Sequence, residues 1–214
     1  MEGKSKAPFV AGVGASAGGL ESLERFFRAL PAKTGIAFVV VQHLSPDHKS
    51  LMEELFTRFT SIPVREATNH EPVRADHIYL LPPGKEIQIS GGCLEVTDRH
   101  TERYLSFPID RFLTSLATEC GARAIAVILS GSGSDGSRGV RRVQAQGGLV
   151  LVEDPEAAAF DGMPRAAIET GDVDAVMSAE GLAHALVEHV TSGELPQGEA
   201  SRVVEEVIAL LRQR

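Results

Sequence analysis

The chain is poor in the residues that several classes of protein require. Its two cysteines, Cys93 and Cys120, are too few for a disulfide framework or a zinc site. Basic residues number 21 against 29 acidic ones, and the formal net charge is −8. Since nucleic acids and anionic membranes are bound by clustered Lys and Arg, we expect neither as a partner. No apolar run approaches the roughly 20 residues of a spanning helix, and residues 1–7 lack the apolar core of a signal peptide, so we expect a soluble, cytoplasmic protein without membrane insertion.

Apolar residues are frequent enough to build a core. Hydrophobic residues make up 43% of the 214 residues and charged residues 23%, close to a globular average. Short apolar runs predict strands at 9–14, 36–41, 78–81, 124–129, 149–152 and 175–177. Amphipathic stretches predict helices at 18–30, from the cap Ser45 onward, and at 108–119, 139–146, 163–169 and 181–190. This alternation predicts an α/β fold with a doubly wound, mostly parallel sheet flanked by helices.

Two further features complete the predicted organisation. Residues 86–90 and 93–97, joined by Gly91-Gly92, predict one antiparallel hairpin. We expect a single domain over 8–190, and a small, polar linker over 191–201. Residues 202–214 carry one apolar stripe and predict a C-terminal helix that either packs on the domain or connects it to another module.

Three reactive residue types follow three predicted parallel strands. Ser16 follows the first strand, His43 the second, and Asp135 lies in the Gly/Ser-rich loop after 124–129. Because carboxyl ends of parallel strands share one edge of a sheet, we expect these residues near one another. A serine, an imidazole and a carboxylate form a nucleophile, a general base and an orienting acid. Asp154 also follows a strand and competes for the acid role.

Other interpretations of the same residues stay open at this point. Gly12, Gly14 and Gly18 approximate a dinucleotide-binding fingerprint, but Gln42-His43 stands where that fingerprint expects an acidic residue. No P-loop is present. His43 and His48 with Asp47 suggest a metal only weakly, so we expect neither a metal nor a cofactor. Asp135 could equally be a turn residue that bonds its own backbone.

Six segments, in order, carry a family resemblance. They are FVAGVGASAGGLESL, VVVQHLSPDHKSL, IYLLPPGKEI, FPIDRFLTSLA, AIAVILSGSGSDGSRGV and VEDPEAAAFDGMPRAAI. Over roughly residues 8–190 the chain resembles the catalytic domain of the chemotaxis protein-glutamate methylesterases (CheB type). The subgroup fused to a receptor methyltransferase domain looks closest. The resemblance implies a methylesterase catalytic domain over 8–190 that acts on methylated chemoreceptor helices in the cytoplasm and in many members also deamidates receptor glutamines. It also implies that 202–214 leads toward a methyltransferase module.

The resemblance also assigns roles residue by residue. The family's nucleophilic serine matches Ser16, its histidine matches His43, and its aspartate matches Asp135 rather than Asp154. Backbone N–H groups near Ala17 and Ser132 would stabilise the oxyanion. The family often has Thr where this chain has Ala17 and Met where it has Ser132, and its stand-alone members carry a receiver domain for which we see no room before the first strand. We therefore expect a serine esterase, with a non-catalytic receptor-binding or regulatory domain of the same fold as the alternative.

Overall fold

The computed structural model describes residues 8–42, 52–99 and 107–194. Seven strands form one sheet in the order β10-β9-β8-β1-β2-β5-β3, and each neighbouring pair is parallel. Their bounds are β1 Phe9–Ala15, β2 Ile36–Gln42, β3 Val64–Glu66, β5 His77–Leu80, β8 Ala124–Ile128, β9 Leu149–Glu153 and β10 Ala175–Met177. The predicted mostly parallel sheet is confirmed.

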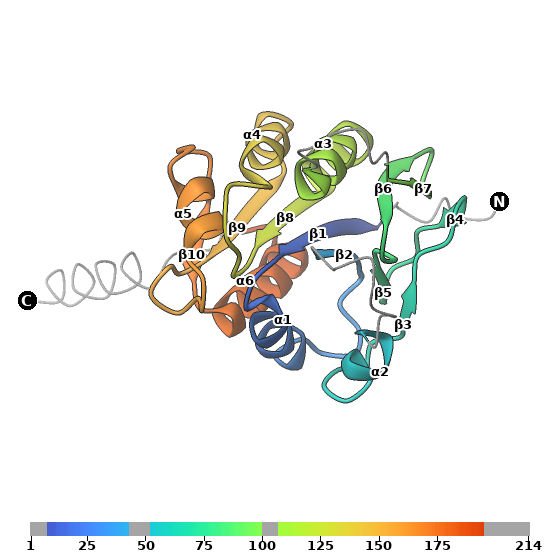
Figure 1. Cartoon of the computed structure of the whole chain (residues 1–214), viewed down its shortest axis with the longest axis horizontal. Coiled ribbons are helices and arrows are strands. Elements are labelled where there is room, and N and C mark those ends of the chain that lie inside the picture. The colour runs from blue at the N-terminus through green and yellow to red at the C-terminus, as the bar shows by residue number, and fades with distance from the viewer. Residues whose placement is uncertain (1–7, 43–51, 100–106, 195–214) are drawn as a thin grey trace, which may run out of the picture.

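Helices cover both faces of this sheet (Figure 1). One layer holds α1 (Gly19–Arg28), α6 (Ala179–Ser192) and the short α2 (Met52–Phe56). The other holds α3 (Pro108–Cys120), α4 (Ser137–Ala145) and α5 (Gly162–Ile168), with a 3-10 turn at Gly121–Arg123. Side chains of β1 alternate between the two layers, as a strand covered on both sides requires.

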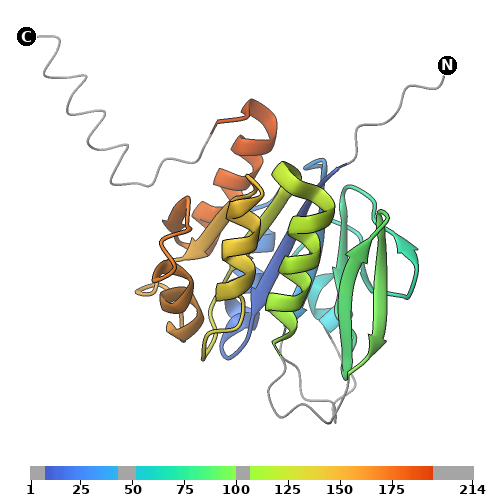
Figure 2. The same cartoon turned by 90° about the horizontal axis from the view of Figure 1, so that it is seen from above.

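A second sheet lies beside α3 (Figure 2). It is antiparallel, in the order β4 (Glu71–Pro72), β7 (Cys93–Asp98) and β6 (Lys85–Ser90). Gly91 and Gly92 both have positive φ, 58° and 74°, which is the backbone of a two-residue hairpin turn. The predicted hairpin is confirmed, and β6 is tied to α3 because the Ile89 N–H donates to Ser115 Oγ at 3.1 Å.

Some boundaries differ from the sequence predictions. The strands β3 and β4 have three and two residues, too few to show a pattern, and were not predicted. Helix α6 reaches Ser192 and ends at Gly193, whose φ is 76°, so it extends into the predicted linker. The start of the helix predicted from Ser45, the rest of the linker and the 202–214 helix lie outside the described residues.

Candidate active site

The sheet order creates a switch point between β1 and β8. From β1 the chain builds β2 on one side, and it later returns to build β8 on the other. The loops after β1 and β8 therefore leave the carboxyl edge next to each other in opposite directions. Ligands of open α/β sheets bind at such points.

The turn after β1 presents Ser16. The Ser16 N–H donates to the carbonyl of Ser130, beyond β8, at 3.0 Å, and the Ser16 carbonyl accepts from the Gly19 N–H at 2.9 Å. Gly18 has a φ of 67°, and a Cβ there would lie 2.8 Å from the Cβ of Ala159. A tight turn with small neighbours leads directly into α1, whose N-terminal N–H groups carry partial positive charge.

The loop after β8 packs against that turn. Ser130 is fully buried, and a Cβ on Gly131 would lie 2.9 Å from the Cβ of Ser16. Ser132 follows on the exposed side of the loop. Gly131 is thus the contact that lets the two loops meet, and the predicted role of the Ser132 backbone at the oxyanion stays a prediction.

Asp135 is buried at the end of the same loop and is 4% exposed. Its Oδ2 accepts from the Ile109 N–H at 3.0 Å and its Oδ1 from the Asp110 N–H at 2.9 Å, at the start of α3. Asp110 in turn accepts from the Gly139 N–H of α4 at 2.8 Å. The two carboxylates thus cap each other's helices, and burial, with the charge of Asp135 nearby, raises the pKa of Asp110.

The competing aspartate behaves differently. Asp154 Oδ1 accepts from the Glu156 N–H at 2.9 Å, two residues along its own turn. Asp135 instead bonds a distant helix, so the interpretation of a turn residue that bonds its own backbone describes Asp154 better.

Glycines 12 and 14 have a packing explanation. A Cβ on Gly12 would lie 2.7 Å from Leu113 Cδ2, and one on Gly14 would lie 2.7 Å from Ile109 Cγ2. Both glycines therefore let α3 approach β1 closely. They do not require a bound dinucleotide.

Sequence reasoning missed the buried carboxylate of Glu153, which is 0% exposed at the end of β9. It accepts from Ser22 Oγ at 3.0 Å and from the Ser130 N–H at 2.8 Å. Burial raises its pKa, against the effect of both hydrogen bonds and of Arg25. A signal was available, since Glu153 ends an otherwise apolar strand at the same edge of the sheet as Ser16.

His43, together with His48 and Asp47, lies outside the described residues, so its position relative to Ser16 and Asp135 stays a prediction. Within 8–42, 52–99 and 107–194, no cluster of three His, Cys, Asp or Glu side chains could hold a metal ion. Across these same ranges, no helix combines the length and apolar character needed to traverse a bilayer.

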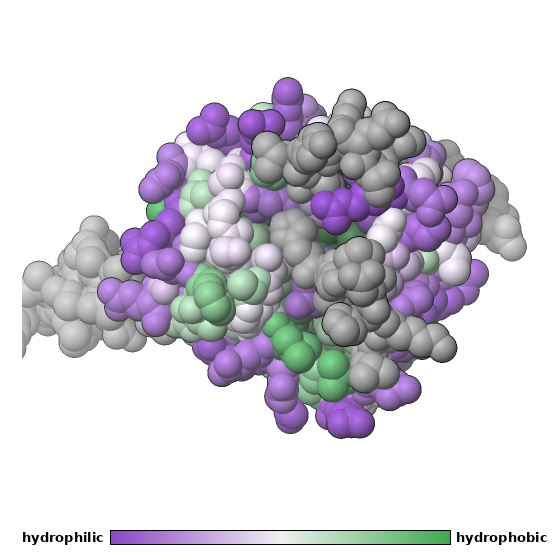
Figure 3. All heavy atoms as spheres, in the orientation of Figure 1, coloured by the Kyte–Doolittle hydropathy of each residue, from purple (hydrophilic) through white to green (hydrophobic). Residues whose placement is uncertain are grey.

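Apolar side chains are exposed beside the Ser16 turn. Phe160 is 50% exposed and Leu20 is 37% exposed. Phe160 Cδ2 would lie 2.9 Å from a Cβ on Gly18, which places the ring against the turn. Figure 3 shows apolar patches over α1 and over the segment that precedes α5. This rim could contact an apolar part of a substrate.

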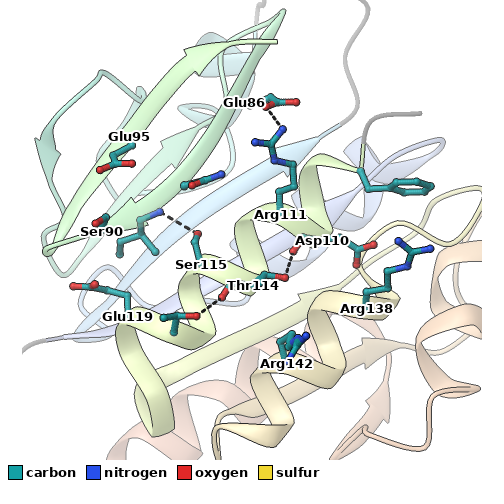
Figure 4. A pocket seen from close by; sticks show the side chains of 14 residues that line it. Glu86, Ser90, Glu95, Asp110, Arg111, Thr114, Ser115, Glu119, Arg138 and Arg142 are labelled. Carbon is teal, nitrogen blue, oxygen red and sulfur yellow. Dashed lines mark hydrogen bonds and ion pairs between the residues drawn. The ribbon is translucent and has the colours of Figure 1, made fainter. Parts of the chain in front are cut away.

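A polar groove of about 730 Å³ runs along α3, between the hairpin and α4 (Figure 4). Phe107 and Asp110 line the end near the carboxyl edge of the main sheet, and Glu119 lines the other end. Arg111 pairs with Glu86 across the groove. The lining carries both signs of charge, so it selects neither anions nor cations.

Comparisons with known proteins agree with this architecture. The family model described as CheB methylesterase matches residues 11–186. The chain belongs to the CheB methylesterase family. The catalytic domain of the Thermotoga maritima CheB methylesterase matches with a TM-score of 0.76 and 28% identity, covering 86% of this chain and 99% of that one.

Two longer relatives match this chain over only part of their own length. An uncharacterised 104.1 kDa protein of Rhodobacter capsulatus is 44% identical over 129 residues, 60% of this chain and 13% of that protein. Protein-glutamate methylesterase/protein-glutamine glutaminase 6 of Anaeromyxobacter dehalogenans is 35% identical over 200 residues, 87% of this chain and 56% of that enzyme. The chain therefore spans little more than half of one relative and a small part of the other.

Proposed function

We propose that this CheB-family domain is a serine esterase that removes methyl groups from glutamate side chains on chemoreceptor helices. The observation that supports it most is the meeting of two loops at the switch point. One loop presents Ser16 at the start of α1, and the other carries the buried Asp135. The names of the relatives state protein-glutamate methylesterase activity for those proteins.

In the proposed reaction, Ser16 Oγ attacks the ester carbonyl while His43 accepts its proton. Backbone N–H groups near Ala17 and Ser132 stabilise the oxyanion, helped by the N-terminus of α1. His43 then protonates the methoxide leaving group, and methanol departs. Water, activated by His43, hydrolyses the glutamyl-serine ester. Asp135 orients the imidazole throughout.

The same acyl chemistry serves a glutamine side chain, with ammonia as the leaving group. The relatives' names include glutaminase activity, so deamidation is part of the proposal. The apolar rim at Phe160 and Leu20 would contact the receptor helix beside the modified residue. A methyltransferase module elsewhere in a longer protein stays a prediction from the resemblance.

Methanol release from a methylated receptor fragment tests this function. Ser16→Ala should lower kcat by about 10⁶-fold, because the nucleophile is lost. Ser192→Ala, at the exposed end of α6, is the matched control and should keep the parent rate. A Ser16→Ala rate within tenfold of the parent would refute the nucleophile. If the unmodified chain bound the receptor but released no methanol, a non-catalytic receptor-binding domain would be favoured. The residues Ala17 and Ser132, which depart from the family pattern, are the sequence support for that alternative.

A further inference from the structure

Glu153 is joined to Ser16 through a single residue. Strands β9, β8 and β1 lie side by side, and their carboxyl ends meet at one edge (Figure 1). The Glu153 carboxylate accepts the Ser130 N–H at 2.8 Å, and the Ser130 carbonyl accepts the Ser16 N–H at 3.0 Å. The backbone of Ser130 therefore transmits the position of the carboxylate to the turn that presents the nucleophile.

The same carboxylate also holds the helix behind that turn. Its other oxygen accepts from Ser22 Oγ on α1 at 3.0 Å, and the Arg25 guanidinium of α1 lies 3.8 Å from that oxygen. One buried group thus fixes both the helix that follows Ser16 and the loop that faces it.

Ser130 extends this network over the rest of the loop. Its hydroxyl donates to the Ala17 carbonyl at 2.9 Å and accepts from the Phe160 N–H at 3.0 Å. The Gly131 N–H donates to the Phe160 carbonyl at 2.9 Å. A shift of Ser130 would therefore move the Ser16 turn, the backbone near Ala17 and the apolar rim together.

We propose that Glu153 is a positioning residue, which sets the spacing between the Ser16 turn and the 130–132 loop through its hydrogen bonds to Ser22 and Ser130. The inference rests on the proposed esterase function. Burying a carboxylate is costly unless specific hydrogen bonds compensate for the lost hydration. A carboxylate that only joined two elements of the fold would therefore not need to be buried. The carboxylate acts by the geometry of its two oxygens, and its negative charge is secondary.

Three substitutions separate geometry from charge. In Glu153→Gln, Oε1 can accept from the Ser130 N–H and the amide can donate to Ser22 Oγ, so kcat should stay within about threefold of the parent. Glu153→Asp keeps the charge, but the shorter side chain cannot reach both donors. Glu153→Asp and Glu153→Ala should each lower kcat by about 10- to 100-fold, with KM nearly unchanged, because small misplacements of reacting groups cost rate.

Asp174, directly before β10, offers a matched control because it bonds to the opposite, amino end of β9. It accepts from the Val150 N–H at 2.8 Å and from Gln144 Nε2 at 3.1 Å, so Asp174→Ala also removes a carboxylate that ties β9 to its neighbours. This variant should lose stability but keep the parent kcat. Equal losses of kcat in Asp174→Ala and Glu153→Ala would overturn the proposal, as would a Glu153→Asp variant more active than Glu153→Gln.

Amide hydrogen exchange gives a readout independent of the esterase. Exchange at Ser16 and Ser130 should be faster in Glu153→Asp than in the parent, and unchanged there in Asp174→Ala. If the parent released no methanol, the proposed function would fail, while this exchange pattern would still support the tie. Unchanged exchange at both residues in Glu153→Asp would overturn the proposed role of Glu153. Glu153→Asp also keeps the proposal testable if Glu153→Ala does not fold.

Discussion

At both edges of the main sheet, carboxylates accept hydrogen bonds from backbone N–H groups, but the carboxylates at the two edges differ in burial. At the amino edge, Asp76 accepts from the Thr34 and Gly35 N–H groups, and Asp174 accepts from the Val150 N–H. At the carboxyl edge, Asp110, Asp135 and Glu153 accept from backbone N–H groups in the same way. The amino-edge carboxylates are half-buried, and the three at the carboxyl edge are buried.

We interpret this difference as one between carboxylates that only join elements and carboxylates that position the proposed active site. A half-buried carboxylate keeps part of its hydration, so it can join two strands at little cost. Burial of the same group disfavours its charge, which is why the pKa values of Asp110 and Glu153 are raised. Costly buried carboxylates gather at the edge that presents Ser16, and such groups cluster at functional sites.

The largest effect in this comparison is expected for Asp135→Asn. Each oxygen of Asp135 accepts one N–H of α3, so an amide would satisfy only one of them, at a cost of about 1–3 kcal/mol. If Asp135 also orients His43, kcat for methanol release should fall by about 10⁴-fold. Chemical denaturation and methanol release measure the two effects.

The matched variant at the amino edge is Asp76→Asn. A single oxygen of Asp76 accepts both N–H groups, at 2.6 and 2.8 Å, and an Asn oxygen can do the same. Stability should change by less than about 0.5 kcal/mol, and kcat should stay at the parent value. If both variants lost kcat equally, the two edges would not differ in function.

The sequence predicted the parts of the site that follow from parallel strands. Runs such as 36–41 are apolar on both faces, which indicates a covered parallel sheet, and that in turn places Ser16 and the loop of Asp135 at one edge. The position of His43 stays a prediction.

Two features could not be predicted from the sequence: the capping of α3 by Asp135 and of α4 by Asp110, and the hydrogen bonds of Glu153 to Ser22 and Ser130. They depend on which strand lies beside which, and the order β9-β8-β1 brings together residues more than 100 positions apart, as Ser22 and Glu153 show. Asp110 caps α4 where α3 packs closely on it at Gly139, a position at which a Cβ would lie 2.5 Å from Leu113 Cβ.

A smaller effect is expected in the pH dependence of stability at Asp110. Its pKa is raised in the folded state, so between the unfolded and folded pKa values the folded chain binds more protons. The contribution of Asp110 to stability therefore falls as pH rises through that window. Asp110→Asn keeps an acceptor for the Gly139 N–H and removes the titration. The free energy of unfolding of the parent, minus that of the variant, should fall as pH rises from about 4 to 7, and a rising difference would contradict the burial argument.

The smallest effect, of opposite sign, is expected at an exposed ion pair. Glu180 of α6 accepts from the Arg25 guanidinium at 2.8 and 2.9 Å, and this lowers its pKa from 4.5 to about 2. A lowered carboxyl pKa gives stability that is present above 4.5 and lost as pH falls toward 2. Because the Glu180 side chain is 43% exposed, solvent screens the pair.

We expect Glu180→Gln to cost less than about 1 kcal/mol at pH 7, to cost progressively less as pH falls toward the lower pKa, and to leave kcat unchanged. Urea unfolding across this pH range, repeated in high salt, measures it, since salt should shrink the difference at pH 7. A loss as large as that of Asp135→Asn would mean that exposure does not separate the two kinds of carboxylate. A loss that grew on acidification would contradict the sign.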